Sequence, residues 1–241
     1  MNREQVYGRR AVRESLRGRR EVLELWATER ALKAEAWLRE AERPRLQVKA
    51  ERELTEAAGT RDHQGVVAWC EPYRYADAWE LASAEHPLLA CLDQVTDPRN
   101  LGAVVRSAEG AGATGVVVPA HGSATVTPAV CRASAGAVEH LPVAVVPNLA
   151  RYLAEAKRPD LWIYAATGDA RRTMWQSDLG GGVAFVFGAE GKGIRPLVRR
   201  TCDDAVSIPV AGNVESLNVS VAAALLLYEA RRQRGGGGGV P

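Results

Sequence analysis

The segment Phe185–Leu197 reads Phe-Val-Phe-Gly-Ala-Glu-Gly-Lys-Gly-Ile-Arg-Pro-Leu and decides the fold. An apolar run typical of a buried strand opens into three glycines around one acid, and a helix is expected to begin at Pro196. Glycines at such a turn let the backbone approach a ligand closely and leave N–H groups free. The spacing matches neither a P-loop nor the Gly-x-Gly-x-x-Gly fingerprint of dinucleotide folds. Taken alone, the segment predicts either a ligand loop or a tight connection.

A second strand-to-helix turn lies upstream, in Leu92–Ala108. Asp97 and Pro98 set a turn or a helix start, and Asn100 is suited to cap the helix that follows. Arg106 then lies in the middle of a helix whose other residues are mostly small and apolar, where a positive charge is unexpected. This pattern leaves two interpretations open, a functional arginine and a surface arginine beside a neighbouring acid.

A third turn of this kind lies in Ser207–Ala224. A strand ends near Pro209, a polar loop follows, and an Ala-rich helix comes after the loop. Ser216 is a good N-cap for that helix, with Asn218 and Ser220 in its first turn. Plain capping explains Ser216 well but explains Asn218 poorly.

Around these turns, apolar runs alternate with helical patterns from residue 88 onward. Strands are expected at Leu88–Leu92, Gly115–Val118, Val143–Val146, Leu161–Ala165, Val183–Phe187 and Ala205–Ile208. Helices are expected at Asn100–Ala111, Pro128–Val138, Leu149–Lys157, Pro196–Thr201 and Leu217–Arg232. Buried strands separated by helices favour a parallel sheet covered on both faces. Each of the three turns lies where a strand ends, which is where such sheets bind ligands.

The first block of the chain is a smaller alternating unit. A helix is expected over Val6–Arg17, and later short strands and helices complete a small α/β domain. The pattern fades before residue 88, and the chain ends in five glycines, Val240 and Pro241, which should be flexible. The division expected is a small domain over 1–72, a linker over 73–87, a larger domain over 88–234 and a flexible tail over 235–241.

Charge and cysteine usage narrow the class of protein. The net charge of the 241 residues is +2, but in residues 1–20 seven arginines against two glutamates give a local net of +5. That basic start fits contact with nucleic acid or a solvated helix face. The four cysteines form no Cys-x-x-Cys motif, so zinc-ribbon and redox motifs are absent. Neither a secretory signal nor a membrane-spanning run is found, so a reducing, aqueous compartment, the cytoplasm, is expected.

Taken together, the three turns resemble the signature motifs of the SpoU/TrmH-type RNA ribose methyltransferases, a branch of the SPOUT superfamily. The matching positions are Asn100-x-Gly102 with Arg106, Gly188-x-Glu190-Gly191-x-Gly193, and Ile208-Pro209 with Ser216-Leu217-Asn218-Val219-Ser220. The resemblance covers roughly Leu88 to Arg232, and no motif position departs from it. It implies an α/β fold whose C-terminal SPOUT domain has a parallel sheet and a deep trefoil knot. Strand patterning alone would not suggest a knot.

The first block resembles the RNA-binding domain of the bacterial enzymes that methylate a guanosine of 23S ribosomal RNA. The resemblance lies in Val6–Val12 and Asp62–Ala68, and the His-Gln-Gly step before a strand is typical of that subgroup. It implies a small, ribosomal-protein-like α/β domain that binds the RNA substrate. The residues expected to contact RNA are Arg9, Arg10, Arg13, His63 and Gln64.

The resemblance also implies that the cofactor is S-adenosyl-L-methionine, held mainly by backbone groups of the motif loops. By position, the cofactor-binding residues are Thr167, Gly168, Gly188, Glu190, Gly191, Ile208 and Leu217. The adenine is expected in an apolar slot near Ile208 and Leu217. The methyl donor is already activated, so no metal is expected. The helix after the third motif is a dimer surface in the family, which implies a homodimer through the C-terminal domain; burial in a monomer core is the alternative.

The reaction implied is methyl transfer to a ribose 2′-hydroxyl, which requires in-line alignment and removal of the hydroxyl proton. In the family Arg106 stands at this point. A guanidinium is a poor base, so two roles stay open for Arg106: base, or a group that orients an RNA phosphate and stabilises negative charge on the 2′-oxygen. Asn100, Glu190, Ser216 and Asn218 are expected to position the ribose, the cofactor and Arg106.

Three rival functions remain on sequence alone. Relatives with the same motifs methylate transfer RNA, and the N-terminal resemblance favours 23S ribosomal RNA over it. A non-catalytic RNA-binding factor for ribosome assembly would keep the fold, but the motif residues are intact. A nucleotide-dependent oxidoreductase would need the dinucleotide fingerprint, which is missing.

Overall fold

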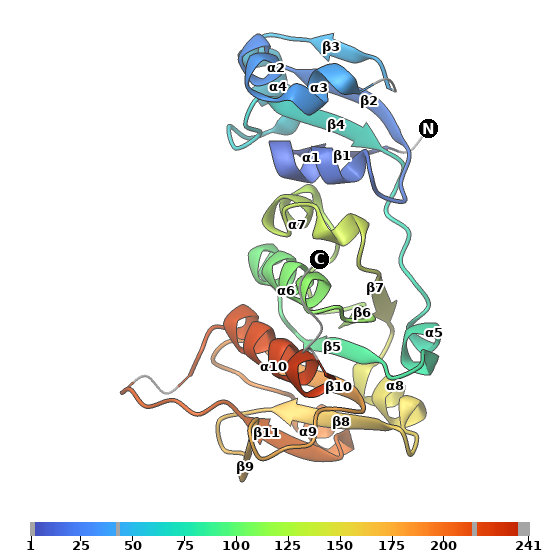
Figure 1. Cartoon of the computed structure of the whole chain (residues 1–241), viewed down its shortest axis with the longest axis vertical. Coiled ribbons are helices and arrows are strands. Elements are labelled where there is room, and N and C mark those ends of the chain that lie inside the picture. Colours follow the sequence, from blue (N-terminus) through green and yellow to red (C-terminus); the bar gives the residue numbers. More distant parts are fainter. Residues whose placement is uncertain (1–2, 42–43, 214–215, 236–241) are drawn as a thin grey trace. The chain divides into compact units, whose positions relative to one another are not determined.

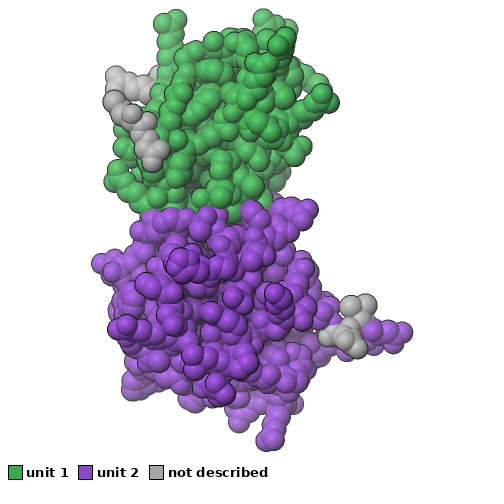
Figure 2. All heavy atoms as spheres, turned by 180° about the vertical axis from the view of Figure 1, so that it is seen from behind, with its two compact units in different colours: residues 1–74, 126–140 green, residues 75–125, 141–241 purple. Residues whose placement is uncertain are grey.

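The chain forms two compact units, coloured separately in Figure 2. The computed structural model describes residues 3–41, 44–213 and 216–235. Unit 1 comprises Met1–Arg74 and Val126–His140, and unit 2 comprises Tyr75–Thr125 and Leu141–Pro241. Most of the segment expected to be a linker, residues 73–87, therefore belongs to unit 2, where it carries helix α5 (Ala78–Ser83). Apart from Gly235, the expected Gly-rich tail lies outside the described residues.

Unit 1 is built on a four-stranded sheet (Figure 1). Its elements are β1 (Glu4–Tyr7), α1 (Arg9–Ser15), β2 (Val22–Ala27), α2 (Glu29–Ala34), α3 (Ala36–Glu40), β3 (Leu46–Val48), α4 (Glu51–Ala58), β4 (Val66–Cys70), α7 (Pro128–Ala133) and the 3₁₀ helix η1 (Ala137–Glu139). The strand order is β1-β4-β2-β3; β4 is antiparallel to both its neighbours, and β2 is parallel to β3. The expectation of a small α/β domain is confirmed.

The start of unit 1 differs from the single helix expected over Val6–Arg17. The backbone is extended through Tyr7, and Gly8 turns it with a φ of 95° before α1 begins. Val6 is buried as part of a strand and does not share a helix face with later residues. The turn requires glycine for its backbone angle, and a Cβ at Gly8, 2.6 Å from Arg132 Cδ, would also displace the Arg132 side chain.

A buried ion pair ties Val126–His140, which the sequence places in the second domain, into unit 1. Arg20 donates from Nε to Glu139 Oε2 at 3.0 Å and from a terminal nitrogen to Glu139 Oε1, and both side chains are buried. Burial acts to lower the pKa of Arg20, but the hydrogen bond and charge of Glu139 outweigh this and raise it above its ordinary value. Arg20 is therefore a structural residue, not part of a basic surface.

Unit 2 is built on a seven-stranded sheet in the order β7-β6-β5-β10-β8-β11-β9, and every neighbouring pair is parallel. Its remaining elements are β5 (Leu88–Asp93), α6 (Pro98–Gly110), β6 (Gly115–Pro119), β7 (Val143–Val146), α8 (Leu149–Ala156), β8 (Leu161–Ala166), β9 (Arg172–Thr173), β10 (Gly182–Gly188), α9 (Pro196–Thr201), β11 (Asp204–Ser207) and α10 (Val219–Gln233). The six strands expected from apolar runs are confirmed, and the two-residue β9 is an addition. The trefoil knot stays a prediction.

Helices cover both faces of this sheet, as the alternating pattern predicts. α5, α8 and α9 pack with strand residues such as Leu89, Ile163 and Val186 into one apolar core. α6 and α10 lie side by side against the sheet (Figure 1). Burial on two faces explains why the strands read as continuous apolar runs. Among the described residues, no helix is long and apolar enough to cross a membrane.

Candidate active site

Four neighbouring strands of unit 2 end at one edge of its sheet. β5, β10, β8 and β11 are adjacent and parallel, so their carboxyl ends point the same way. The loops that follow them begin at Gln94, Ala189, Thr167 and Ile208. All three motif turns of the sequence thus start at one edge, where open parallel sheets bind their ligands.

One carboxylate oxygen joins the three motifs. Glu190 Oε1 accepts hydrogen bonds from Asn218 Nδ2 at 2.7 Å and from Asn100 Nδ2 at 3.0 Å. Asn218 Nδ2 also donates to Asn100 Oδ1 at 3.1 Å. Three side chains expected to be catalytic therefore form one polar cluster, although 118 residues separate the first from the last.

Two capping predictions were wrong, and their correction explains why the cluster forms. Asp97, not Asn100, caps α6, and its side chain accepts from Arg99 N at 2.8 Å. Asn218, not Ser216, caps α10, and its Oδ1 accepts from Ser220 N at 2.8 Å. Because the cap of α6 is supplied elsewhere, the whole Asn100 amide is available to the cluster.

The glycines at the end of β10 and in the loop after it are required because this loop folds back on itself. Gly193 N donates to Ala189 O at 2.8 Å. A Cβ on Gly188 would lie 2.1 Å from the carbonyl carbon of Gly193, so no larger residue fits there. Gly191 and Gly193 have φ values of 74° and 66°, in the left-handed region that glycine adopts without strain. This fold holds Glu190 between two constrained glycines.

An ion pair between a buried carboxylate and a partly exposed arginine, which the sequence did not predict, anchors the far end of this loop. Asp93, the last residue of β5, is fully buried. Its carboxylate accepts from Arg195 N at 2.8 Å and from Arg195 Nε at 2.8 Å. An acid that ends a six-residue apolar strand was the available signal, because a buried carboxylate requires a partner. The pair holds the loop after β10 against the end of β5.

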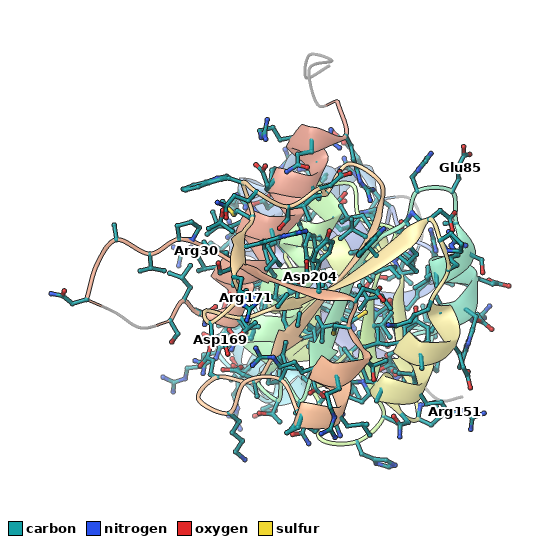
Figure 3. All side chains as sticks on the ribbon, turned by 90° about the horizontal axis from the view of Figure 1, so that it is seen from below. Arg30, Glu85, Arg151, Asp169, Arg171 and Asp204 are labelled. Carbon is teal, nitrogen blue, oxygen red and sulfur yellow. The ribbon has the colours of Figure 1, made fainter. Side chains whose placement is uncertain are left out.

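Three residues expected to bind the cofactor, Thr167, Ile208 and Leu217, lie in loops at this edge, and their role in binding stays a prediction. Thr167 N donates to Val206 O at 3.0 Å, which binds the end of β8 to β11. Asp169, labelled in Figure 3, accepts from Thr167 Oγ1 and from Arg199, and these hydrogen bonds lower the pKa of its carboxyl group. Ile208 is half-buried and Leu217 is exposed, so both leave apolar surface for a planar ring.

Arg106 and Ser216 are not drawn into the cluster. Both side chains are exposed, Arg106 on α6 and Ser216 in the loop before α10. Within the described part of the chain, neither makes a hydrogen bond or ion pair with Asn100, Glu190 or Asn218. The same part of the chain contains no group of three His, Cys, Asp or Glu side chains able to hold a metal ion.

In unit 1, the five residues expected to contact RNA have different environments. Arg10 and Arg13 are exposed on α1. Arg9 is partly tied down, since its Nη1 contacts Glu35 Oε1 at 3.2 Å and its Nε donates to Gln64 O at 3.1 Å. His63 is fully buried and accepts from a backbone N–H two residues later. His63 therefore shapes the loop, and Gln64 is the side chain of that loop that lines its surface.

A parallel α/β sheet with a polar cluster at its carboxyl edge is an arrangement typical of open-sheet α/β enzymes. Comparison with known families identifies the family to which the chain belongs. The SpoU rRNA methylase family model matches residues 87–228. The model of the RNA 2′-O ribose methyltransferase substrate-binding domain matches residues 5–76. The chain belongs to the SpoU rRNA methylase family, which confirms the resemblance seen in its motifs.

Individual relatives agree with this assignment. The 23S rRNA (guanosine-2′-O-)-methyltransferase RlmB of Pseudomonas putida is 42% identical over 236 residues, covering 93% of this chain and 94% of that protein. The putative TrmH family tRNA/rRNA methyltransferase YacO of Bacillus subtilis is 39% identical over 231 residues, covering 92% of each. The structure of the SpoU methyltransferase AviRb from Streptomyces viridochromogenes, in complex with AdoMet, has a TM-score of 0.80 at 27% identity, covering 96% of this chain and 90% of that one.

Proposed function

We propose that the chain transfers a methyl group from S-adenosyl-L-methionine to the ribose 2′-hydroxyl of a guanosine in 23S ribosomal RNA. The main support is the cluster in which Glu190 Oε1 joins Asn100 and Asn218 at the carboxyl edge of the sheet. Relatives named as 23S rRNA guanosine methyltransferases, at 42% identity over nearly the whole chain, favour this substrate. A ribosomal RNA substrate also favours a cytoplasmic enzyme.

The cofactor supplies an activated methyl group. Backbone groups of the loops after β8, β10 and β11 would hold it, and the apolar surfaces of Ile208 and Leu217 would contact its ring. Glu190 accepts both amides through Oε1, and among the described residues Oε2 has no hydrogen-bond donor. Oε2 is therefore free to accept a hydrogen bond from a bound hydroxyl or amine. Ser216 is exposed one residue before Leu217, so its hydroxyl is available to a bound ligand.

Arg106 follows Asn100 by six residues in the sequence, but within the described residues its side chain makes no hydrogen bond or ion pair with the cluster. An exposed guanidinium with no acid paired to it within the described residues is available to an RNA phosphate. Two roles are compatible with this position: Arg106 accepts the proton of the 2′-hydroxyl after losing its own proton to solvent, or it stays charged, orients the phosphate and stabilises negative charge on the 2′-oxygen. The second role needs no change in the high pKa that a guanidinium ordinarily has.

Unit 1 selects the RNA, and α10 forms a homodimer surface. Arg10 and Arg13 supply phosphate contacts, which position the RNA without reading its sequence.

The proposed homodimer surface lies on α10. Three large apolar side chains on this helix are exposed, those of Val221, Leu225 and Tyr228. Spacings of four and three residues put them on one helix face. An apolar face of this kind fits a second copy of the chain.

A methyl-transfer assay tests the proposed function. Purified protein is given labelled S-adenosylmethionine with unmodified 23S and transfer RNA, and protected riboses are mapped by their resistance to alkaline cleavage. One protected guanosine in 23S RNA is expected, and Arg106→Ala should nearly abolish transfer while cofactor binding is largely kept. A protected site in transfer RNA would overturn the substrate, and cofactor binding with no transfer to any RNA would favour a non-catalytic factor.

A further inference from the structure

A cavity of about 350 Å³ lies within unit 1. Its lining residues are Arg9, Thr28, Arg30, Glu51, Gln64 and Gly65. The volume falls in the range of about 300–1,000 Å³ that is usual for small-ligand sites. The sequence predicts that Arg9 and Gln64 contact RNA. It predicts no role for Thr28, Arg30 and Glu51. The cavity brings these two groups of residues together.

One wall of the cavity is a strained and rigidly held loop. Gln64 has a φ of 54°, which a residue other than glycine rarely adopts. Gly65 N donates to His63 Nδ1 at 3.0 Å, and His63 Nε2 contacts Thr55 Oγ1 at 3.0 Å. A Cβ on Gly65 would lie 2.6 Å from Thr28 Oγ1. Strain of this kind persists only where the surroundings enforce it and is concentrated at functional sites.

The polar groups of the cavity differ in how far they are already paired. Arg9 donates from its backbone N to Gln64 Oε1 at 3.2 Å and contacts Glu35, so it is fixed in place. Arg30 is exposed and, within the described ranges, makes no ion pair or hydrogen bond through its side chain. Within the same ranges, the only partner of the Glu51 carboxylate is His63 Nε2, at 3.5 Å, and the Glu51 side chain is 67% exposed. The cavity therefore offers one available cation and one available carboxylate.

We propose that this cavity receives an unstacked guanine base of the RNA substrate, which rests on the proposed function in RNA methylation. Guanine presents two acceptors, O6 and N7, on one edge, and arginine recognises this pair in a bidentate manner. Its N1–H and N2–H₂ groups are donors that a carboxylate accepts. Arg30 and Glu51 match these two sets. Adenine places a donor where guanine has O6, so it fits this pair of side chains poorly. Sequence-specific proteins read unpaired RNA bases in this way.

The test uses the full chain and the 23S RNA fragment that carries its methylation site. Dissociation constants are measured for the wild type, Arg30→Ala and Glu51→Gln, with each unpaired guanine replaced in turn by 7-deazaguanine, which lacks N7, or by inosine, which lacks the N2 amino group. At one position, 7-deazaguanine should weaken wild-type binding about 5- to 100-fold. In Arg30→Ala, the same replacement should weaken RNA binding little further, because the contact to N7 is already lost. Likewise, inosine should weaken the binding of the wild type but should weaken the binding of Glu51→Gln little further. Arg52→Ala is the matched control, because Arg52 lies next to Glu51 on α4 but pairs with Glu56 outside the cavity.

Two results would overturn the inference, and they differ from failure of the proposed function. If the wild type methylates the RNA but no guanine position is coupled to Arg30 or Glu51, the cavity does not read a base. If Arg30→Ala and Arg52→Ala weaken binding equally, Arg30 acts only as one more surface cation. If the wild type neither binds nor methylates RNA, the proposed function fails and this inference fails with it. Thermal unfolding checks that both exposed substitutions leave the fold intact.

Discussion

Asn218 Nδ2 donates a 2.7 Å hydrogen bond to Glu190 Oε1, and this contact joins the cap of α10 to the loop after β10. The same amide oxygen that caps the helix, Asn218 Oδ1, accepts from Ser220 N, so the orientation of the side chain is fixed at both ends. Glu190 is thereby held without using its second oxygen. A charge-bearing acceptor at this point strengthens both amide hydrogen bonds.

Substitutions of Glu190 should therefore separate charge from contact. Glu190→Ala removes the acceptor of both amides, and we expect kcat/KM for methyl transfer to fall by about 100-fold or more, since a hydrogen bond to a charged group contributes about 1.5–3 kcal/mol. Glu190→Gln keeps an oxygen but no charge and should lose about 10-fold. Glu155→Gln, an exposed acid on α8 paired with Arg151, is the control. Wild-type kinetics in Glu190→Ala would show that the cluster is not part of the active site.

Gly188→Ala should disrupt the loop that carries Glu190. The new Cβ would lie 2.1 Å from the backbone of Gly193, and backbone cannot move aside as a flexible side chain can. We expect a loss of about 1–3 kcal/mol in unfolding free energy and weaker cofactor binding, measured by denaturant titration and calorimetry. Gly212→Ala is the control, because a Cβ there meets nothing within 4 Å. Equal effects of the two substitutions would contradict the close-packing argument.

The ion pair of Asp93 and Arg195 should act on the site by positioning the loop. Asp93→Asn weakens the hydrogen bonds at a fully buried acceptor, so we expect unfolding free energy to fall by about 1–3 kcal/mol. The KM for S-adenosylmethionine should rise more than kcat falls. The matched pair is Asp160 with Arg158, where the acid is exposed and Asp160→Asn should cost less than about 1 kcal/mol. A fall in kcat alone would point to a direct role of Asp93 in the reaction.

Some features of the fold and of the site could be predicted from the sequence alone. The six strands were predictable because a sheet buried on both faces requires continuous apolar runs. The meeting of Asn100, Glu190 and Asn218 followed from motifs placed at strand ends. The cap of α10 was not predictable, since Ser216 and Asn218 are nearly equivalent cap residues and only local backbone geometry selects one. Asp97 was the better candidate for the cap of α6, because Pro98 marks the first helical position. Arg20 was misjudged because its partner, Glu139, lies 119 residues away.

Charge reversal on α1 should weaken RNA binding in a salt-dependent way. Arg10 and Arg13 are exposed, whereas Arg9 and Arg20 are held by acids, so the double variant Arg10→Glu with Arg13→Glu removes the available cations of this helix. We expect the slope of log K against log salt to fall by about 1.4–1.8, because each of the two phosphate contacts contributes about 0.7–0.9. Binding is measured by fluorescence anisotropy from low to moderate salt.

The control for α1 is Arg39→Glu in the same unit, where the arginine donates to Leu32 O and is expected to change the slope little. An unchanged slope in the double variant would show that Arg10 and Arg13 do not contact RNA phosphates and belong only to a solvated helix face.

Buried thiols should make unit 1 unstable in alkali. Burial raises the pKa of Cys70 to about 11 and of Cys131 to about 12, from 9.0, and the opposing charge of Arg20 does not cancel this. A pKa that is higher in the folded state means that folding favours the protonated thiol. The contribution to stability is therefore complete below pH 9 and is lost as the pH rises through about 11–12, by up to about 1.4 kcal/mol per pH unit for each thiol.

Urea unfolding of the wild type and of Cys70→Ala with Cys131→Ala between pH 7 and 11 measures this effect. The variant starts less stable, because two small buried side chains leave unfilled space, but it should lose less stability between pH 9 and 11. Groups elsewhere that titrate in this range, such as lysines and tyrosines, are common to both proteins and cancel in the difference. Parallel pH profiles would mean that the two thiols ionise in the folded state as readily as in the unfolded chain, and that water reaches the buried surroundings of Arg20.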